Sequence, residues 1–238
     1  MSKTIGILGG MGPEATIYMF RLIVDLTKVE KDQDHIPIII FNNPKIPDRT
    51  AAILRGGSSP LPYLVDGAVF LEKAGADFIL MPCVTAHYFY KKIVKHITIP
   101  FLHLLEESID YVKRDLGHVK RIGLLATDGT VQTGLFQELF NRNGIEIVVP
   151  KKEEQNLIMK ALYQNEGIKA GYKEIPREMI LQVLQQLIRD KVEGIIAGCT
   201  EIPLVISQSD MEIPFINPLK IVAGKSILTA GYNTICTR

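Results

Sequence analysis

Three short segments of this chain recur in the same order in its second half. Thr4-Ile-Gly-Ile-Leu-Gly-Gly aligns with Arg121-Ile-Gly-Leu-Leu-Ala-Thr at an offset of 117 residues, Cys83 and Cys199 are 116 apart, and Ile99-Pro-Phe-Leu and Ile213-Pro-Phe-Ile are 114 apart. A nearly constant offset is typical of an internal repeat, and the matched Ile-Pro-Phe and Cys positions exceed what apolar runs alone would produce. The sequence therefore predicts two halves that fold alike.

Short β-branched segments alternate with longer segments of helical period in both halves. The pattern predicts strands near 3–9, 36–41, 77–82, 99–103, 120–126, 145–149, 193–198 and 213–216, and helices near 13–29, 60–74, 86–96, 104–116, 131–143, 153–164, 174–190 and 218–233. Continuous apolar strands separated by helices are typical of parallel sheets covered on both faces. We therefore predict an α/β fold of two similar three-layer α/β/α lobes with mainly parallel sheets. Pseudo-twofold symmetry would relate the lobes, with the active site in the cleft between them.

The Ile-Pro-Phe segments are where we expect the chain to cross between lobes. This gives an N-terminal lobe of residues 1–98 plus 209–238 and a second lobe of residues 99–208, sizes that suit a chain of 238 residues. No linker rich in Gly or Ser separates them, so firm packing is expected. The loop-like stretch 42–60 is long enough to act as a lid or rim.

Charge and composition exclude several classes of protein. The net charge is +1 and the basic residues are dispersed, so the chain lacks the basic surface of a nucleic-acid-binding protein. No apolar run is long enough for a membrane span, and the first strand begins at Lys3 or Thr4, which leaves no room for a signal peptide. We expect a cytoplasmic protein whose Cys83 and Cys199 are free thiols and whose third cysteine, Cys236, is incidental.

Both repeated cysteines directly follow predicted strands. Phe78-Ile-Leu-Met-Pro-Cys-Val-Thr leads to Cys83, and Gly194-Ile-Ile-Ala-Gly-Cys-Thr-Glu leads to Cys199. A thiol at a strand end facing a helix N-terminus can have a lowered pKa, and its thiolate can act as a base. One such cysteine is more often a small buried hydrophobic residue, but two at symmetric positions favour catalysis. Thiols on opposite sides of a small molecule suit removal of a proton from one face of a carbon and its return on the other.

The threonines that follow the two cysteines each have two possible roles. Thr85 and Thr200 can hydrogen-bond to substrate or cap the helix that follows. Glu201 is positioned in the sequence to orient or tune Cys199.

A glycine-rich turn follows the first predicted strand. Gly10-Met-Gly-Pro-Glu-Ala15 matches a dinucleotide fingerprint only weakly, because the second strand ends in Phe41-Asn-Asn43 where an acidic residue would be required. Pro13 suits the first position of a helix, so backbone N–H groups at Met11 and Gly12 would suit a small anion such as a carboxylate. A turn whose glycines merely allow close packing is the other reading.

Several longer motifs resemble those of the aspartate/glutamate racemase family, in particular its cofactor-independent aspartate racemase-like branch. They are Ile7-Leu-Gly-Gly-Met-Gly-Pro-Glu-Ala-Thr16, Ile46-Pro-Asp-Arg-Thr-Ala-Ala-Ile53, Met81-Pro-Cys-Val-Thr-Ala-His87, Ala126-Thr-Asp-Gly-Thr130, Gly167-Ile-Lys-Ala-Gly171 and Ile196-Ala-Gly-Cys-Thr-Glu201. The resemblance covers nearly the whole chain. It implies proton exchange at the α-carbon between two cysteines, here Cys83 and Cys199, without pyridoxal phosphate, metal or another cofactor. It also implies a homodimer.

The same resemblance assigns roles to further residues. Arg49 is similar to a family arginine that binds the side-chain carboxylate of the substrate. A guanidinium can bind a carboxylate through two parallel hydrogen bonds. Lys169 is similar to a lysine that reaches the cleft, and Thr127 and Thr130 are expected to bind the α-carboxylate or line the cleft. With Met11, Gly12, Val84, Thr85 and Thr200 these form the expected substrate site, and His87 and Glu201 are expected to support it. In relatives the first-lobe cysteine serves the D-enantiomer and the second-lobe cysteine the L-enantiomer, which would apply to Cys83 and Cys199 here.

Val84 departs from the family pattern. The family usually has asparagine after the first cysteine, where it contacts the substrate, and valine can neither donate nor accept a hydrogen bond. Loss of that partner would cost roughly 1–3 kcal/mol if the substrate group stayed buried and unpaired. Asn217 is a second departure, at a position where relatives often have aspartate.

These observations favour an amino-acid racemase whose partner is a small acidic amino acid, with aspartate favoured over glutamate. A decarboxylase or isomerase of a small dicarboxylate is one alternative, although such enzymes tend to need only one of the two cysteines. A non-catalytic dicarboxylate-binding protein is the other, suggested by Val84.

Overall fold

A computed structural model describes residues 2–235, and Cys236 lies outside them. The chain forms two compact units, one of residues 1–107 with 219–238 and one of residues 108–218. The first boundary falls inside helix α5 (Leu104–Asp115) and the second at the start of helix α10 (Pro218–Thr229). The sequence predicts the corresponding breaks at 98/99 and 208/209.

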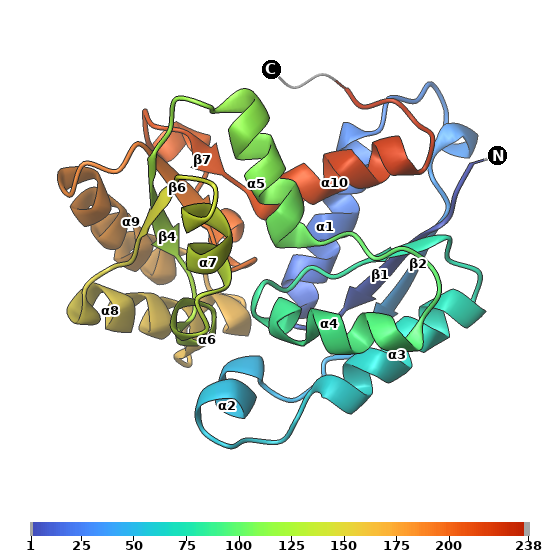
Figure 1. The fold of residues 1–238 in the computed structure, drawn as a ribbon, viewed down its shortest axis with the longest axis horizontal. Helices are drawn as coiled ribbons and strands as arrows, with labels where there is room; N and C mark the ends of the chain where they lie inside the picture. The colour runs from blue at the N-terminus through green and yellow to red at the C-terminus, as the bar shows by residue number, and fades with distance from the viewer. Residues whose placement is uncertain (1, 236–238) are drawn as a thin grey trace. The chain divides into compact units, whose positions relative to one another are not determined.

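The first unit contains a parallel sheet of three strands in the order β2-β1-β3. The strands are β1 (Ile5–Gly9), β2 (Ile38–Asn42) and β3 (Phe78–Leu80). Its helices are α1 (Pro13–Leu26), α2 (Arg49–Leu54), α3 (Leu61–Lys73), α4 (Tyr90–Ile93) and most of α10, with short 3₁₀ helices at Asp32–Asp34, Thr85–Phe89 and Val94–His96. Figure 1 shows α3 and α4 on one side of β1 and β2, and α1 with α10 on the other.

Apolar side chains cover both faces of this sheet. Helix α1 begins at Pro13, whose fixed φ suits the first helical position, and its buried residues recur at helical spacing. They are Ala15, Thr16, Met19, Leu22, Ile23 and Leu26. On the other face Leu64, Ala68 and Leu71 of α3 pack with Leu8 and Ile79 of the sheet. The predicted three-layer α/β/α arrangement is therefore present in this unit.

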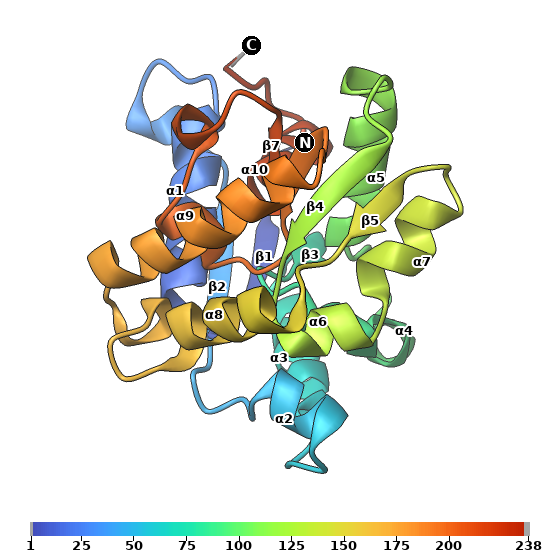
Figure 2. The same ribbon diagram turned by 90° about the vertical axis from the view of Figure 1, so that its left-hand side faces the viewer.

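The second unit contains a parallel sheet of four strands in the order β5-β4-β6-β7. The strands are β4 (Arg121–Leu125), β5 (Glu146–Val148), β6 (Gly194–Ala197) and β7 (Phe215–Ile216). Its helices are α6 (Asp128–Gln132), α7 (Leu135–Asn141), α8 (Lys152–Tyr163) and α9 (Glu174–Arg189), with 3₁₀ helices at Ile168–Ala170, Ile202–Leu204 and Gln208–Asp210. Figure 2 shows α8 and α9 on one side of β4 and α7 on the other.

The two sheets repeat each other down to single hydrogen bonds. In the first unit Ile79 of β3 donates its N–H to Pro100 O at 2.9 Å and bridges to Phe101. In the second, Ile195 of β6 donates to Pro214 O, also at 2.9 Å, and pairs with Phe215. Each Ile-Pro-Phe segment thus lies beside the third strand of its own half. The parallel α/β fold predicted from the alternation of strands and helices is confirmed.

Four predicted elements differ in detail from the structure. Residues 99–103 contribute a single bridge at Phe101 where a strand was expected. The expected helix 86–96 is divided into two 3₁₀ segments around the short α4. The expected helix 131–143 is divided at Gly134, whose φ of 68° is left-handed, and its first part begins earlier because Thr127 caps it. Within the expected loop 42–60 lies α2, since the Asp48 side chain accepts from Ala51 N–H at 2.7 Å.

No helix within residues 2–235 is both long and apolar enough to cross a membrane.

Candidate active site

Cys83 lies three residues beyond the end of β3 and is 5% exposed. Its N–H donates to Met81 O at 2.8 Å, and the chain then enters the 3₁₀ helix Thr85–Phe89. The side chain of His87 turns back to the Cys83 carbonyl, with Nδ1 at 2.8 Å from the oxygen. The position of Cys83 is therefore fixed by contacts on both sides of it in the sequence.

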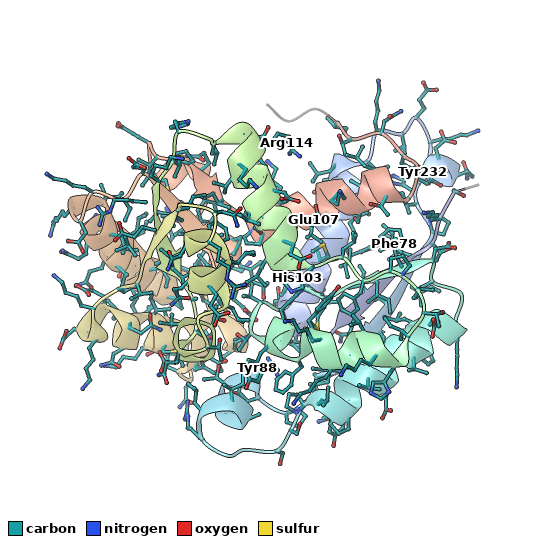
Figure 3. All side chains as sticks on the ribbon, in the orientation of Figure 1. Phe78, Tyr88, His103, Glu107, Arg114 and Tyr232 are labelled. Atoms are coloured by element: carbon teal, nitrogen blue, oxygen red, sulfur yellow. The ribbon has the colours of Figure 1, made fainter. Side chains whose placement is uncertain are left out.

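His87 is neutral and in one tautomer. Burial, together with neighbouring His103, lowers its pKa to about 3. Its Nε2 accepts from Leu104 N–H at 3.3 Å, so Nδ1 must carry the proton that it donates to Cys83 O. His103, which Figure 3 labels at the beginning of α5, packs edge-on against His87 with ring centroids 4.9 Å apart. His87 thus joins the Cys83 segment to α5 and supports the cysteine through its backbone.

The glycine turn after β1 is closely packed. Gly10 has a φ of 97°, and a Cβ there would lie 2.4 Å from the backbone of Asn43, so glycine is required. Its N–H donates to Thr16 Oγ1 at 2.9 Å. Gly12 is the N-cap of α1, and its carbonyl accepts from Thr16 N–H at 3.3 Å. Close packing is therefore observed at Gly10, and anion binding at Met11 and Gly12 stays a prediction.

Arg49 is the first residue of α2 and is only 8% exposed. Its Nη2 donates to Met11 O at 3.0 Å, and its Nη1 lies 3.1 Å from Pro47 O and 3.3 Å from Ile46 O. The capped helix α2 and these carbonyls hold the side chain in place. The guanidinium thereby ties the segment before α2 to the glycine turn.

Val84 and Thr85 are both buried beside Cys83, at 2% and 7% exposure. Val84 O accepts from His87 N–H at 2.9 Å, and Thr85 begins the 3₁₀ helix. Both predicted substrate residues are therefore buried directly after Cys83 in the chain.

Cys199 occupies the equivalent position in the second unit, two residues beyond β6. It is 5% exposed, and its N–H donates to Leu125 O at 3.1 Å. Its Sγ lies 3.0 Å from Glu201 Oε2 and donates to it. Thr200 Oγ1 donates to the same oxygen at 3.2 Å. Glu201 therefore meets the Cys199 thiol in a direct thiol–carboxylate contact.

Glu201 also pairs with Lys169. Lys169 Nζ lies 2.5 Å from Glu201 Oε1, with the lysine side chain 21% exposed and the glutamate side chain 2% exposed. Lys169 Nζ lies 5.4 Å from the Tyr163 ring centroid, within the range of a cation–π contact. The three side chains of Cys199, Glu201 and Lys169 form a continuous chain, which we call the Cys-Glu-Lys chain.

The pKa values along the Cys-Glu-Lys chain follow from burial and these contacts. Burial and the adjacent Glu201 charge raise the pKa of Cys199 well above its ordinary value, although Lys169 opposes them. Burial alone would raise the pKa of Glu201, but Lys169 and the hydrogen bonds from Cys199 and Thr200 hold it below its ordinary value. Burial alone would lower the pKa of Lys169, but Glu201 and Cys199 raise it. This direction is opposite to the lowered pKa that a thiol at a strand end can have, and it favours the protonated form of Cys199.

The flanking glycines explain how Lys169 reaches Glu201. A Cβ at Gly167 would lie 2.9 Å from Leu162 O, and Gly171 has a left-handed φ of 96°. Between them Ile168 is 1% exposed in the core of the unit. The segment is thereby pinned against the end of α8, which presents Lys169 to the buried carboxylate.

Thr127 and Thr130 lie together at the end of β4. Thr127 is the N-cap of α6, and its side chain accepts from Thr130 N–H at 3.4 Å. The two Oγ1 atoms are 3.3 Å apart, and both residues are buried. Tyr163 could not be identified from the sequence, since its approach to Lys169 depends on how the segment after α8 folds back.

Comparison with known proteins identifies the family. The model of the Asp/Glu/Hydantoin racemase family matches residues 8–225. The chain belongs to this family. It is 30% identical over 234 residues to the broad specificity amino-acid racemase RacX of Bacillus subtilis (strain 168), covering 94% of this chain and 97% of that protein. Motifs at both cysteines fall inside the matched range.

Solved structures agree with this assignment. Picrophilus torridus aspartate racemase superposes with a TM-score of 0.89 at 32% identity, covering 98% of this chain and 96% of that one. An aspartate racemase homologue from Pyrococcus horikoshii OT3 gives a TM-score of 0.74 at 26% identity, covering 96% and 99%. The two-lobe fold of this family is therefore the fold of this chain.

Proposed function

We propose that the chain is a cofactor-independent amino-acid racemase that interconverts L and D forms, with aspartate favoured and glutamate a further candidate. Membership of the racemase family supports an isomerase acting on amino acids. The relatives named above are an aspartate racemase and a broad-specificity amino-acid racemase, which supports the substrate class. Pyridoxal phosphate and metal ions have no part in the proposed reaction.

The matched positions of two cysteines carry this proposal. Cys83 and Cys199 follow the third strands of two sheets that repeat each other, and both are free and nearly buried. Ligands of parallel α/β sheets bind at the carboxyl ends of strands. In the proposed reaction one thiolate takes the α-proton from one face of the substrate while the other thiol gives a proton to the opposite face. The thiolate becomes a thiol and the thiol a thiolate, so the protein is left ready for the reverse reaction until proton exchange with water restores the starting form.

Two cationic side chains, those of Arg49 and Lys169, favour a substrate with an acidic side chain. We assign Arg49 to the side-chain carboxylate and Lys169 to the same cleft, with Met11, Gly12, Thr127 and Thr130 available to the α-carboxylate. Thr85 and Thr200 lie beside the two cysteines and complete the proposed site with Val84. Since Arg49 and Lys169 have protein partners in this structure, substrate would have to share or replace those contacts.

Hydrogen exchange at the α-carbon tests the proposal most generally. The protein is incubated in deuterated water with a panel of amino acids in both enantiomeric forms, and α-deuterium is measured by NMR. Exchange and racemisation of aspartate are expected, with glutamate slower. Thermal stabilisation by L-aspartate without any exchange would instead identify a dicarboxylate-binding protein, and loss of a carboxyl group or double-bond movement would identify a decarboxylase or isomerase.

Arg49→Ala tests the assignment of substrate charge. It should reduce turnover of aspartate far more than turnover of any neutral amino acid accepted, because the charge-assisted contact exists only with the acidic side chain. Equal loss for both kinds of substrate would make Arg49 a purely structural residue.

We further propose a homodimer in the cytoplasm, which sedimentation of the purified protein and fractionation of the producing cells would test.

A further inference from the structure

The two cysteine segments differ in charge at one equivalent position. Cys83 is followed by Val84 and Thr85, whereas Cys199 is followed by Thr200 and Glu201. Threonine is uncharged, so a carboxylate at this position is present in the second half alone. Because the halves otherwise repeat each other, Glu201 distinguishes the chemical setting of Cys199 from that of Cys83.

The carboxylate of Glu201 is placed to bind the thiol form of Cys199. A carboxylate accepts hydrogen bonds and cannot donate one, so the contact of 3.0 Å between Sγ and Oε2 exists only while the thiol carries its proton. A thiolate at the same distance would be repelled by the carboxylate in a buried setting, where charges interact strongly. The geometry therefore favours the protonated thiol.

Lys169 acts on this thiol in the opposite direction. Its ammonium binds the other carboxylate oxygen at 2.5 Å and offsets part of the negative charge that Cys199 meets. The titratable groups that face the thiol are Glu201 on its own segment and Lys169 from the segment after α8, with Tyr163 of α8 beyond the lysine. The charge of Lys169 thus determines how strongly the Glu201 carboxylate favours the protonated thiol of Cys199.

We propose that Glu201 is a positioning residue that keeps the proton on the Cys199 thiol of the resting protein, and that Lys169, through Glu201, limits this effect. This inference rests on the proposed racemase function only for its catalytic consequence. In the two-base reaction the resting protein starts with Cys199 as the proton donor, so the enantiomer that presents its α-proton to Cys83 reacts first.

A titration of the Cys199 thiol tests the inference without any assay of turnover. Cys83→Ser and Cys236→Ser are introduced together into the full chain, so that Cys199 is the remaining cysteine, and thiolate is followed by its ultraviolet absorbance against pH. In this background Glu201→Gln should lower the titration midpoint by about one unit or more, a tenfold rise in thiolate at a given pH below it. Lys169→Met should raise the midpoint, because it removes the cation that favours thiolate.

The midpoint is expected to shift down in Glu201→Gln and up in Lys169→Met, and these opposite shifts distinguish the proposed role from general damage to the fold. Glu201→Asp and Lys169→Arg keep the charges and should stay closer to the parent midpoint than the neutral variants do. Circular dichroism and thermal melting identify variants that do not fold. If Glu201→Gln fails to fold, a raised midpoint in folded Lys169→Met still supports the inference.

Three results would overturn it. They are an unchanged or raised midpoint in folded Glu201→Gln, an unchanged or lowered midpoint in folded Lys169→Met, and a shift of both variants in the same direction. Since the titration uses a protein without Cys83, it is independent of racemisation. A protein that passes the titration but exchanges no α-proton would refute the proposed function and leave this assignment of Glu201 standing.

Discussion

The thiol of Cys199 donates a hydrogen bond to the Glu201 carboxylate 3.0 Å away, and this contact favours the protonated form of the cysteine in the resting protein. From the sequence, a cysteine at a strand end could be expected to have a lowered pKa, because a helix N-terminus favours thiolate. Glu201 was visible two residues away, but whether it meets the thiol depends on side-chain direction. Sequence spacing therefore located the functional group, and its protonation state required the structure.

Arg49→Ala is expected to destabilise the protein as well as alter its activity. Three carbonyl oxygens, of Met11, Ile46 and Pro47, would lose a donor, and each one left buried and unsatisfied costs about 1–3 kcal/mol. Urea unfolding should show a loss of at least about 1 kcal/mol. Arg49→Lys should restore only part of it, since one ammonium cannot reproduce the planar fork. An unchanged unfolding free energy in Arg49→Ala would contradict this reading of its contacts.

Val84→Asn tests the departure from the family pattern. If valine costs one hydrogen bond to aspartate, the change should raise kcat/KM for aspartate by about tenfold, equivalent to about 1.4 kcal/mol. If valine instead suits a less polar substrate, turnover of that substrate should fall while aspartate stays poor. Steady-state rates with both substrates separate these outcomes. No change with either one would show that position 84 does not touch the ligand, and Val84→Ile provides the apolar control.

At the scale of elements, the spacing of apolar residues predicts most helices and every strand within the described residues, and it adds one strand, 99–103, that is only a single bridge. The differences come from local hydrogen bonds that periodicity does not register. Thr127 and Asp48 each cap a short helix with their side chains, and left-handed Gly134 divides α6 from α7. The Asp48 cap was readable in principle, because aspartate three residues before an alanine-rich run is a helix-start signal. The division of residues 86–96 has no such signal in the sequence.

His87 joins two elements and should leave a pH dependence in stability. Its pKa is about 3 when folded and about 6.5 when unfolded, so the unfolded chain binds the proton more readily between these values. Unfolding free energy should therefore fall as pH decreases through this window, by up to about 1.4 kcal/mol per unit from this residue. Above about pH 6.5 the contribution is constant.

Urea unfolding between about pH 4 and 7 measures this slope. His87→Asn keeps a donor for the Cys83 carbonyl and cannot titrate. The unfolding free energy of this variant should therefore depend less steeply on pH, by the equivalent of close to one bound proton. His103→Asn measures the separate contribution of the neighbouring ring, because the pKa of His103 is also lowered by burial. An identical slope in His87→Asn and the parent protein would show that His87 is not held neutral.

At the scale of the whole molecule, the repeat was the strongest information in the sequence. It predicted two parallel sheets with cysteines at equivalent ends, and the matching bonds of Ile79 and Ile195 to the Ile-Pro-Phe segments agree with it. A repeat cannot indicate where the halves differ in function. The Cys-Glu-Lys chain of the second unit is such a difference, since it depends on Lys169 approaching from a segment 30 residues earlier than Cys199.

The purified protein should contain no pyridoxal phosphate and should keep its racemase activity with a chelator present. Two thiols supply both proton transfers in the proposed reaction, so no electron sink or Lewis acid is required. Absorbance spectra before and after hydroxylamine, together with activity in chelator, measure this. A visible band that hydroxylamine removes along with activity would contradict the cofactor-independent reaction.

Racemisation and α-deuterium incorporation in Cys83→Ser and Cys199→Ser test the central claim most directly. Each variant is incubated in deuterated water with L-aspartate and, separately, with D-aspartate, and Cys236→Ser serves as the control. Both single variants should lose racemisation in both directions, because turnover needs one group to take a proton and its opposite to give one back. Each is expected to retain at most partial exchange of one enantiomer, and Cys236→Ser should resemble the parent. Racemisation near the parent rate in either Cys83→Ser or Cys199→Ser would contradict the account.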